Sequence, residues 1–70
     1  MMTPWERERA PLTCALLERC WELLQTVEDI EARGRLHGVA FLLTGPARRG
    51  HEADEDDRRE AEETLLRYEQ

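Results

Sequence analysis

The sequence predicts a small all-α protein, a helical hairpin with a short third helix that is completed by oligomerisation. Between Leu12 and Ile30 the apolar residues recur at the spacing of an amphipathic helix. Nothing else in the chain offers the set of pairing partners that a sheet requires. A chain of 70 residues buries only roughly 60% of its unfolded surface. Chains of this size usually depend on a disulfide, a metal or a second chain for stability.

Residues 1–10 are rich in charge, and we expect a flexible lead-in there, followed by one small helical domain over residues 11–70. Pro11 suits the first turn of a helix. From Pro11 to Arg33 the apolar and polar residues separate onto opposite sides of a helical wheel. Gly34 is placed to end this helix in a left-handed conformation. The first predicted helix therefore covers residues 11–33.

The middle of the chain contains a short apolar run, "LHGVAFLLTGP", whose periodicity fits two structures. As a helix over residues 36–44 it would end at Gly45-Pro46, whereas residues 38–43 would equally form a strand. A lone strand lacks pairing partners, so the helix is favoured. Residues 45–53 are then a loop.

The segment from Glu52 to Gln70 is acidic, with nine carboxylates against three arginines. Negative charge is stabilising at a helix N-terminus, where the first backbone N–H groups carry partial positive charge. Ala61, Leu65 and Tyr68 lie at i, i+4 and i+7 and form a narrow apolar stripe. We therefore predict an acidic helix over residues 54–68.

Catalytic residues, a metal site and a cofactor site are not expected in this sequence. The chain has no serine, which excludes Ser-His-Asp chemistry. Cys14 and Cys20 lie six residues apart on one predicted helix, too far around its axis to form a disulfide with each other. Neither His37 nor His51 stands at a metal-ligand spacing from a cysteine. Both cysteines are interpreted as buried small hydrophobic residues.

The apolar arc of the first predicted helix is wider than one neighbouring helix covers in a two-helix seam. The rest of the chain offers few large apolar residues to cover it. We therefore expect a non-catalytic protein–protein interaction module, such as an adaptor, co-chaperone or inhibitor subunit, that binds a protein partner or forms a homodimer. The predicted interface residues are Leu16, Leu17, Cys20, Trp21, Leu23, Leu24, Val27 and Ile30.

The net charge of −6 disfavours binding to nucleic acid and to membrane surfaces. The longest apolar run has five residues, far fewer than a membrane span needs. The N-terminus shows no apolar signal segment, so a cytoplasmic location is expected. Two alternatives stay open: the acidic segment as a nucleic-acid mimic, and a helix-turn-helix DNA binder. The arginines that would serve the second are Arg33, Arg35, Arg48 and Arg49.

Overall fold

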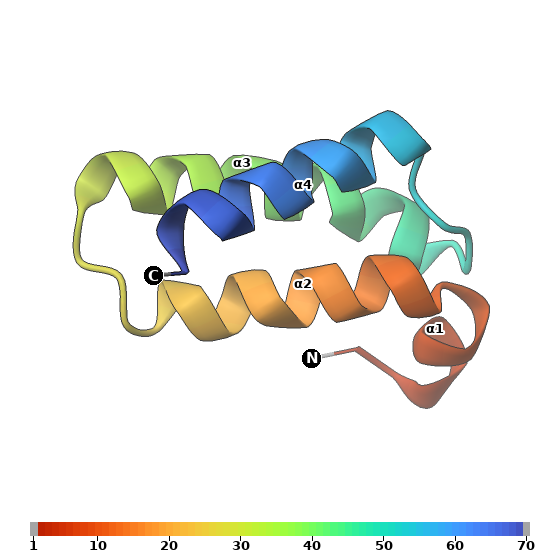
Figure 1. Cartoon of the computed structure of the whole chain (residues 1–70). Helices are drawn as coiled ribbons and strands as arrows, with labels where there is room; N and C mark the ends of the chain where they lie inside the picture. The colour runs from red at the N-terminus through yellow and green to blue at the C-terminus, as the bar shows by residue number, and fades with distance from the viewer. Residues whose placement is uncertain (1, 70) are drawn as a thin grey trace.

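A computed structural model describes residues 2–69 of the chain as four helices, and no strand occurs among these residues (Figure 1). The predicted all-α fold is confirmed. Helices α2, α3 and α4 lie side by side, each antiparallel to the one before it in the chain, and the short α1 lies near the start of α2 (Figure 1). The helices are α1 (Pro4–Arg9), α2 (Pro11–Leu24), α3 (Ile30–Arg48) and α4 (Glu55–Tyr68).

The flexible charged lead-in expected from the sequence over residues 1–10 contains helix α1, so that expectation is corrected. Thr3 caps the helix: its hydroxyl accepts a hydrogen bond from the Glu6 N–H, and the Glu6 carboxylate accepts one from the Thr3 N–H at 2.7 Å. This reciprocal pair satisfies two backbone donors at the helix start. Pro4 follows at the first helical position, where its missing N–H costs nothing.

The single helix predicted over residues 11–33 is wrong, because the chain breaks after Leu24. Asp29 caps a new helix, its carboxylate accepting a hydrogen bond from the Ala32 N–H at 2.9 Å. The Arg33 guanidinium donates to the carbonyl oxygens of Leu24 and Val27, the second at 3.0 Å, which satisfies acceptors left open where α2 ends. Gly34 therefore lies inside α3 and does not end a helix.

Helix α3 contains the whole ambiguous apolar run, so the helix is confirmed and the strand is wrong. The predicted stop at Gly45-Pro46 is also wrong, and the loop expected over residues 45–53 is correspondingly shorter. The helix ends at Arg48, and Gly50, which follows the C-cap residue Arg49, has a positive φ of 72°. The N–H of His51 donates to the Pro46 carbonyl and that of Gly50 to the Ala47 carbonyl, each at 3.0 Å. These two bonds form the Schellman arrangement that closes a helix.

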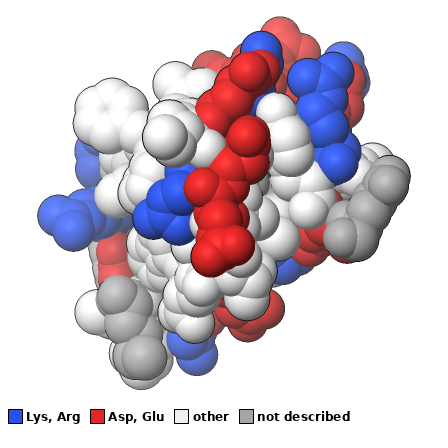
Figure 2. All heavy atoms as spheres, turned by 90° about the vertical axis from the view of Figure 1, so that its left-hand side faces the viewer, with Lys and Arg blue, Asp and Glu red and all other residues white. Residues whose placement is uncertain are grey.

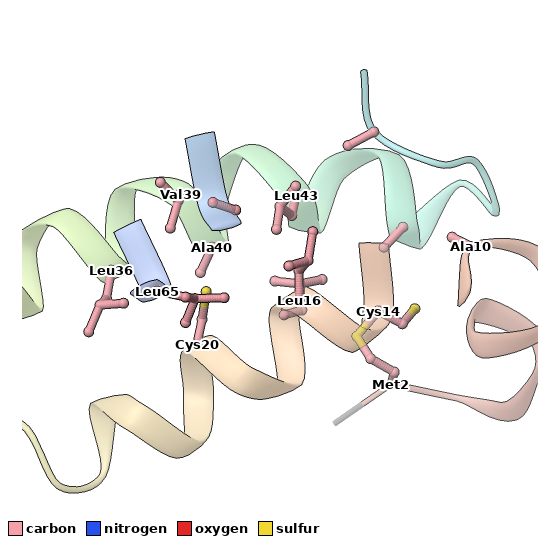
Figure 3. Packing of buried hydrophobic residues seen from close by; sticks show 14 of the residues in the cluster. Met2, Ala10, Cys14, Leu16, Cys20, Leu36, Val39, Ala40, Leu43 and Leu65 are labelled. Atoms are coloured by element: carbon pink, nitrogen blue, oxygen red, sulfur yellow. The ribbon is translucent and has the colours of Figure 1, made fainter. Parts of the chain in front are cut away.

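Helix α4 is confirmed close to its predicted bounds, and three acids occupy its first turn. The core lies between α2, α3 and α4, with α2 side chains directed at α3 and α4 (Figure 3). Its largest fully buried apolar side chains are Leu17, Leu36, Leu43 and Leu65. Six buried alanines fill the spaces between the helices and allow close packing. They are Ala10, Ala32, Ala40, Ala47, Ala53 and Ala61.

Candidate interaction surface

The eight residues predicted as an interface are mostly covered by the chain itself. Four are buried in the core: Leu16, Leu17, Cys20 and Leu24. Three are partly buried and pack against that core: Trp21, Leu23 and Val27. Only Ile30 is open, at 87% exposure, and it belongs to α3 and not to α2. The structure therefore does not bring these eight side chains together on one accessible surface.

The wide apolar arc of α2 is covered because three elements pack on it instead of one. Helices α1, α3 and α4 all contact α2. Met2, in the segment expected to be flexible, is buried in the same cluster. Counting only large apolar residues missed this cover, since alanines at close-packed positions exclude water as completely as leucines do.

Helix α3 has two faces of different composition. Its inward face is entirely apolar and buried, and it comprises Ala32, Leu36, Val39, Ala40, Leu43 and Ala47. Its outward face carries the two most exposed large apolar side chains of residues 2–69, Ile30 at 87% and Phe41 at 82%. Leu42, at the edge of that face, is also exposed. Phe41 therefore buries little of its apolar surface in the chain's own core.

Two glycines, Gly34 and Gly38, lie between those apolar side chains on the outward face of α3. A Cβ atom built at either glycine would meet nothing within 4 Å outside the helix's own backbone. Glycine in a helix interior costs about 0.5–1 kcal/mol relative to alanine. No packing within residues 2–69 accounts for that cost. Glycines that admit close backbone approach are expected where another element lies against the helix.

The two ends of α3 carry opposite charge. Glu28, Asp29 and Glu31 are exposed around its N-terminus. Figure 2 faces the end of the molecule formed by the α2–α3 connection and shows acidic side chains in a band across it, with basic side chains on either side. Arg48 and Arg49 are exposed at the other end of the helix. The outward face of α3 is thus an apolar and glycine-containing stripe with an acidic and a basic end.

The acidic segment from Glu52 is partly engaged in holding the fold together. The Glu52 carboxylate accepts hydrogen bonds from the Thr13 hydroxyl at 2.7 Å, from the Thr13 N–H at 2.8 Å and from the Leu12 N–H at 3.0 Å. Burial acts to raise the pKa of Glu52, but these hydrogen bonds and the nearby Arg58 charge outweigh it and lower the pKa. Glu52 therefore serves as a tertiary cap for the start of α2.

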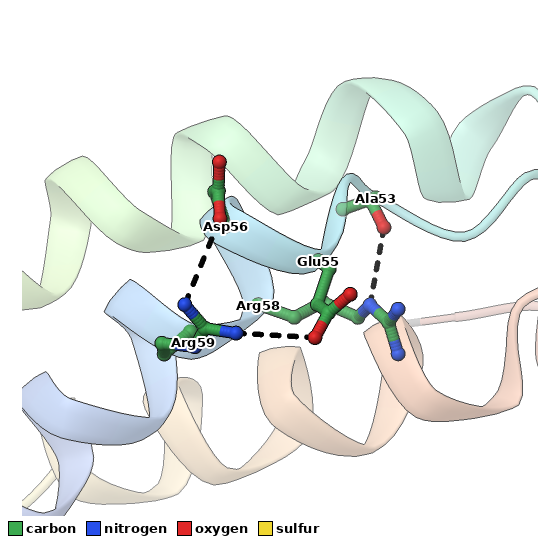
Figure 4. Close-up of polar contacts among 5 residues, drawn as sticks. All are labelled: Ala53, Glu55, Asp56, Arg58 and Arg59. Carbon is green, nitrogen blue, oxygen red and sulfur yellow. Dashed lines mark hydrogen bonds and ion pairs between the residues drawn. The ribbon is translucent and has the colours of Figure 1, made fainter.

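The arginines interleaved with the acids are also engaged locally (Figure 4). Arg59 pairs with Glu55 at 3.1 Å and with Asp56 at 3.8 Å, and Arg58 donates to the Ala53 carbonyl. These exposed pairs neutralise part of the field at the start of α4. A surface that imitates a nucleic-acid backbone would need that negative charge to be unopposed.

The thiols are poorly suited to nucleophilic chemistry in this conformation. Both cysteines are free and buried. Burial raises the pKa of Cys14, and it raises the pKa of Cys20 to about 11. His37 and His51 are exposed. Among residues 2–69 no group of three His, Cys, Asp or Glu side chains is placed to hold a metal ion.

A hollow with a volume of about 510 Å³ lies beside α1. Both tryptophans of the chain line it, together with the oppositely charged Glu6 and Arg48. The hydrogen bonds from the Thr3 backbone and side chain lower the pKa of Glu6. The remaining lining residues are Met2, Thr3 and Thr44. Trp21 thus faces the N-terminal segment of its own chain.

Comparison of the chain with known protein families, curated proteins and solved structures found no match. None of the helices within residues 2–69 has both the length and the apolar composition needed to cross a bilayer. The residues that sequence reasoning missed are Gly34, Gly38 and Phe41. Their spacing of i, i+4 and i+7 was the available signal, because it predicts one shared helical face.

Proposed function

We propose that this protein is a non-catalytic protein–protein interaction module and that the outward face of α3 is its binding surface. The observation that supports this most directly is the exposure of Ile30 and Phe41, at 87% and 82%, on either side of Gly34 and Gly38. Buried aromatic anchors contribute most of the energy of many protein interfaces. Phe41 is available for that role because its own chain does not cover it.

A scatter of exposed apolar side chains is normal on a protein surface and needs no explanation. Here the exposed side chains are aligned, since Ile30 and Phe41 lie about 20° apart around the helix axis at 100° per residue. The glycines at positions 34 and 38 allow a partner backbone to approach between them. Alignment and access together favour a binding surface over chance exposure.

Residues 2–69 carry no arrangement that favours catalysis, a cofactor or nucleic-acid binding as the role of the protein. The two thiols are buried and their pKa values are raised. In the acidic segment, Glu52 caps the start of α2. Two free cysteines fit a reducing compartment, which supports action in the cytoplasm. Binding by the apolar face of α3 is therefore the function that we infer.

Photo-crosslinking in the native host tests this proposal. A photoreactive phenylalanine analogue replaces Phe41 in the full chain, and the matched control carries it at Leu66, which is 66% exposed on α4. We expect one covalent adduct of defined mass at position 41, suppressed by excess wild-type chain but not by excess chain carrying Phe41→Ser. The absence of an adduct, or the same adducts at both positions, would overturn the proposal.

A further inference from the structure

The outward face of α3 is complementary to itself when a second copy is turned end for end. We propose that it binds a second copy of this chain, with the two α3 helices antiparallel about a twofold axis. This inference rests on the proposed function, because it names the partner of the surface proposed there.

Large and small residues alternate along this face. At 100° per residue, five positions of α3 fall within about 60° of one another, the last of them Arg48 at the basic end, and the four before it alternate in size. A twofold axis between residues 37 and 38 sets Phe41 of each copy opposite Gly34 of the other. The same axis sets each Ile30 opposite a Gly45, which is partly covered by the Arg49 side chain of its own copy. In a parallel pair, by contrast, Phe41 would meet Phe41 and glycine would meet glycine, which leaves gaps. The four positions, in order, are Ile30, Gly34, Phe41 and Gly45.

The charges at the ends of α3 select the same arrangement. An antiparallel pair brings the basic end of each copy to the acidic end of the other, whereas a parallel pair brings like charges together. Within residues 2–69 neither Arg48 nor Arg49 forms an ion pair. The Arg49 guanidinium lies over Gly45, with one nitrogen 3.5 Å from where a Cβ would stand. It would therefore lie near the second copy's Ile30 and the acidic end of that copy's α3, where Glu31 also pairs with Arg35 at 3.6 Å.

The dimensions of α3 suit such an interface. A helix of 19 residues is about 28 Å long, and the longest dimension of the molecule is 32 Å. Contact along a single helix face belongs to the small class of interfaces, so the dissociation constant is expected between about 1 and 100 μM. The net charge of −6 opposes the approach of two copies, and the paired ends offset part of that repulsion.

Sedimentation equilibrium of the purified chain, from about 1 μM to 1 mM, measures this association. Wild type should show a reversible monomer–dimer equilibrium. Gly34→Ala and Phe41→Ser should each raise the dissociation constant at least tenfold. In the single chain the methyl group added at Gly34 meets nothing within 4 Å, so that variant keeps the fold. The matched control Leu66→Ser, on α4, should leave the dissociation constant unchanged.

Thiol cross-linking tests the orientation. Ile30→Cys and Gly45→Cys chains, mixed and treated with a short bifunctional thiol reagent, should give a covalent dimer. Each variant alone should not, because the two Ile30 positions of an antiparallel pair lie about 22 Å apart. The native cysteines are buried and react slowly. Cross-linking of each variant with itself would show a parallel pair and overturn the arrangement.

The outcomes also separate this inference from the proposed function. A chain that stays monomeric to about 1 mM, or a dimer that Gly34→Ala and Phe41→Ser do not weaken, overturns the homodimer. If position 41 then still captures a different single protein, the interaction surface stands and its partner is that protein. If position 41 captures nothing and the chain stays monomeric, both proposals fall.

Discussion

The two faces of α3 follow opposite rules of helix composition. The inward face is built from leucine, valine and alanine, all buried, and helix propensity agrees with burial at every position but the β-branched Val39. The outward face combines glycines, which weaken the helix, with Ile30 and Phe41, which remain in water. Local preference and tertiary environment agree on the first face and conflict on the second. Such conflicts are expected at functional positions, where selection acts on something other than the stability of the single chain.

The sharpest test of this comparison replaces one large apolar residue on each face. Leu43→Ala should lower the free energy of unfolding by about 2–5 kcal/mol, because it opens a cavity at a fully buried site. Phe41→Ala should change it by no more than about 0.5 kcal/mol, because the ring is 82% exposed. Urea denaturation followed by circular dichroism on dilute protein measures both. Equal losses would mean that the two faces are not distinct.

Gly34, within α3, and Gly50, just after it, offer a second contrast, because only Gly50 has a conformation that requires glycine. Gly50→Ala should destabilise by about 1–2 kcal/mol or more, since Gly50 holds a left-handed conformation with φ of 72°. A Cβ there would also lie 2.6 Å from Cη2 of Trp5, so the Trp5 ring must move. The melting temperature and the Trp5 emission spectrum, measured in a Trp21→Phe background, report the two effects. A stable Gly50→Ala protein with unchanged emission would contradict the observed helix end.

Removing the hydrogen bonds of Glu52 tests how much the contact between the loop after α3 and the start of α2 stabilises the fold. At pH 7, Glu52→Gln should cost about 1.5–3 kcal/mol, the range for hydrogen bonds that involve a charged group. The folded state lowers the pKa of Glu52 below its ordinary value of 4.5. Its contribution is therefore complete above the unfolded pKa and is lost as the pH falls through the folded pKa.

The difference in stability between wild type and Glu52→Gln should accordingly shrink on acidification from pH 6 downward, as followed by urea denaturation at each pH. Glu55→Gln is the matched control, because Glu55 is exposed and forms only a surface pair with Arg59. Its effect should stay within about 0.5 kcal/mol. A wild-type advantage that persists unchanged at the lowest pH would show that the carboxylate is not the stabilising form.

The smallest expected effect has the opposite sign. In dilute protein, Gly34→Ala should stabilise the single chain by about 0.5–1 kcal/mol, because alanine restricts the unfolded chain and favours the helix. Ala32→Gly, on the inward face of the same helix turn, should destabilise by at least that amount. Thermal melts at low concentration measure both changes. Destabilisation by Gly34→Ala would mean that the outward glycine already has a packing role within the single chain.

Much of the fold could be predicted from periodicity. The all-α class, the position of α4 and the buried side of the middle helix follow from apolar spacing, and the face that holds Leu36, Val39, Ala40 and Leu43 is buried as that spacing predicts. These features depend on sums over many residues. Errors at single positions therefore do not change them.

The break between α2 and α3 could not be found in the same way. Val27 and Ile30 continue the apolar period through the segment that joins α2 to α3. A helical wheel therefore shows one helix where there are two. The local signal was Asp29 as an N-cap, and a distant one was Arg33, whose guanidinium satisfies the end of α2. A capping signal inside an apolar period is weaker evidence than the period itself.

The interaction surface was misplaced for a related reason. The prediction compared the apolar arc of α2 with the number of large apolar residues in the rest of the chain. That number seemed too small to cover the arc. Exposure is decided by which faces the bundle turns inward, and that depends on all helices at once. Phe41 lies within the apolar run of the middle helix, but its helical phase places it opposite the buried Leu36 and Leu43, so it is exposed.

The contact between Trp5 and Gly50 bears on the order in which the chain assembles as it is synthesised. Helix α1 has six residues, fewer than the 12–15 or so that an isolated helix needs to persist in water. Its capping box is local, but the Trp5 ring packs beside Gly50, which follows the end of α3. The ribosome therefore releases α1 long before its docking site exists. We expect α1 to pack only after α2 and α3 have begun to form the bundle.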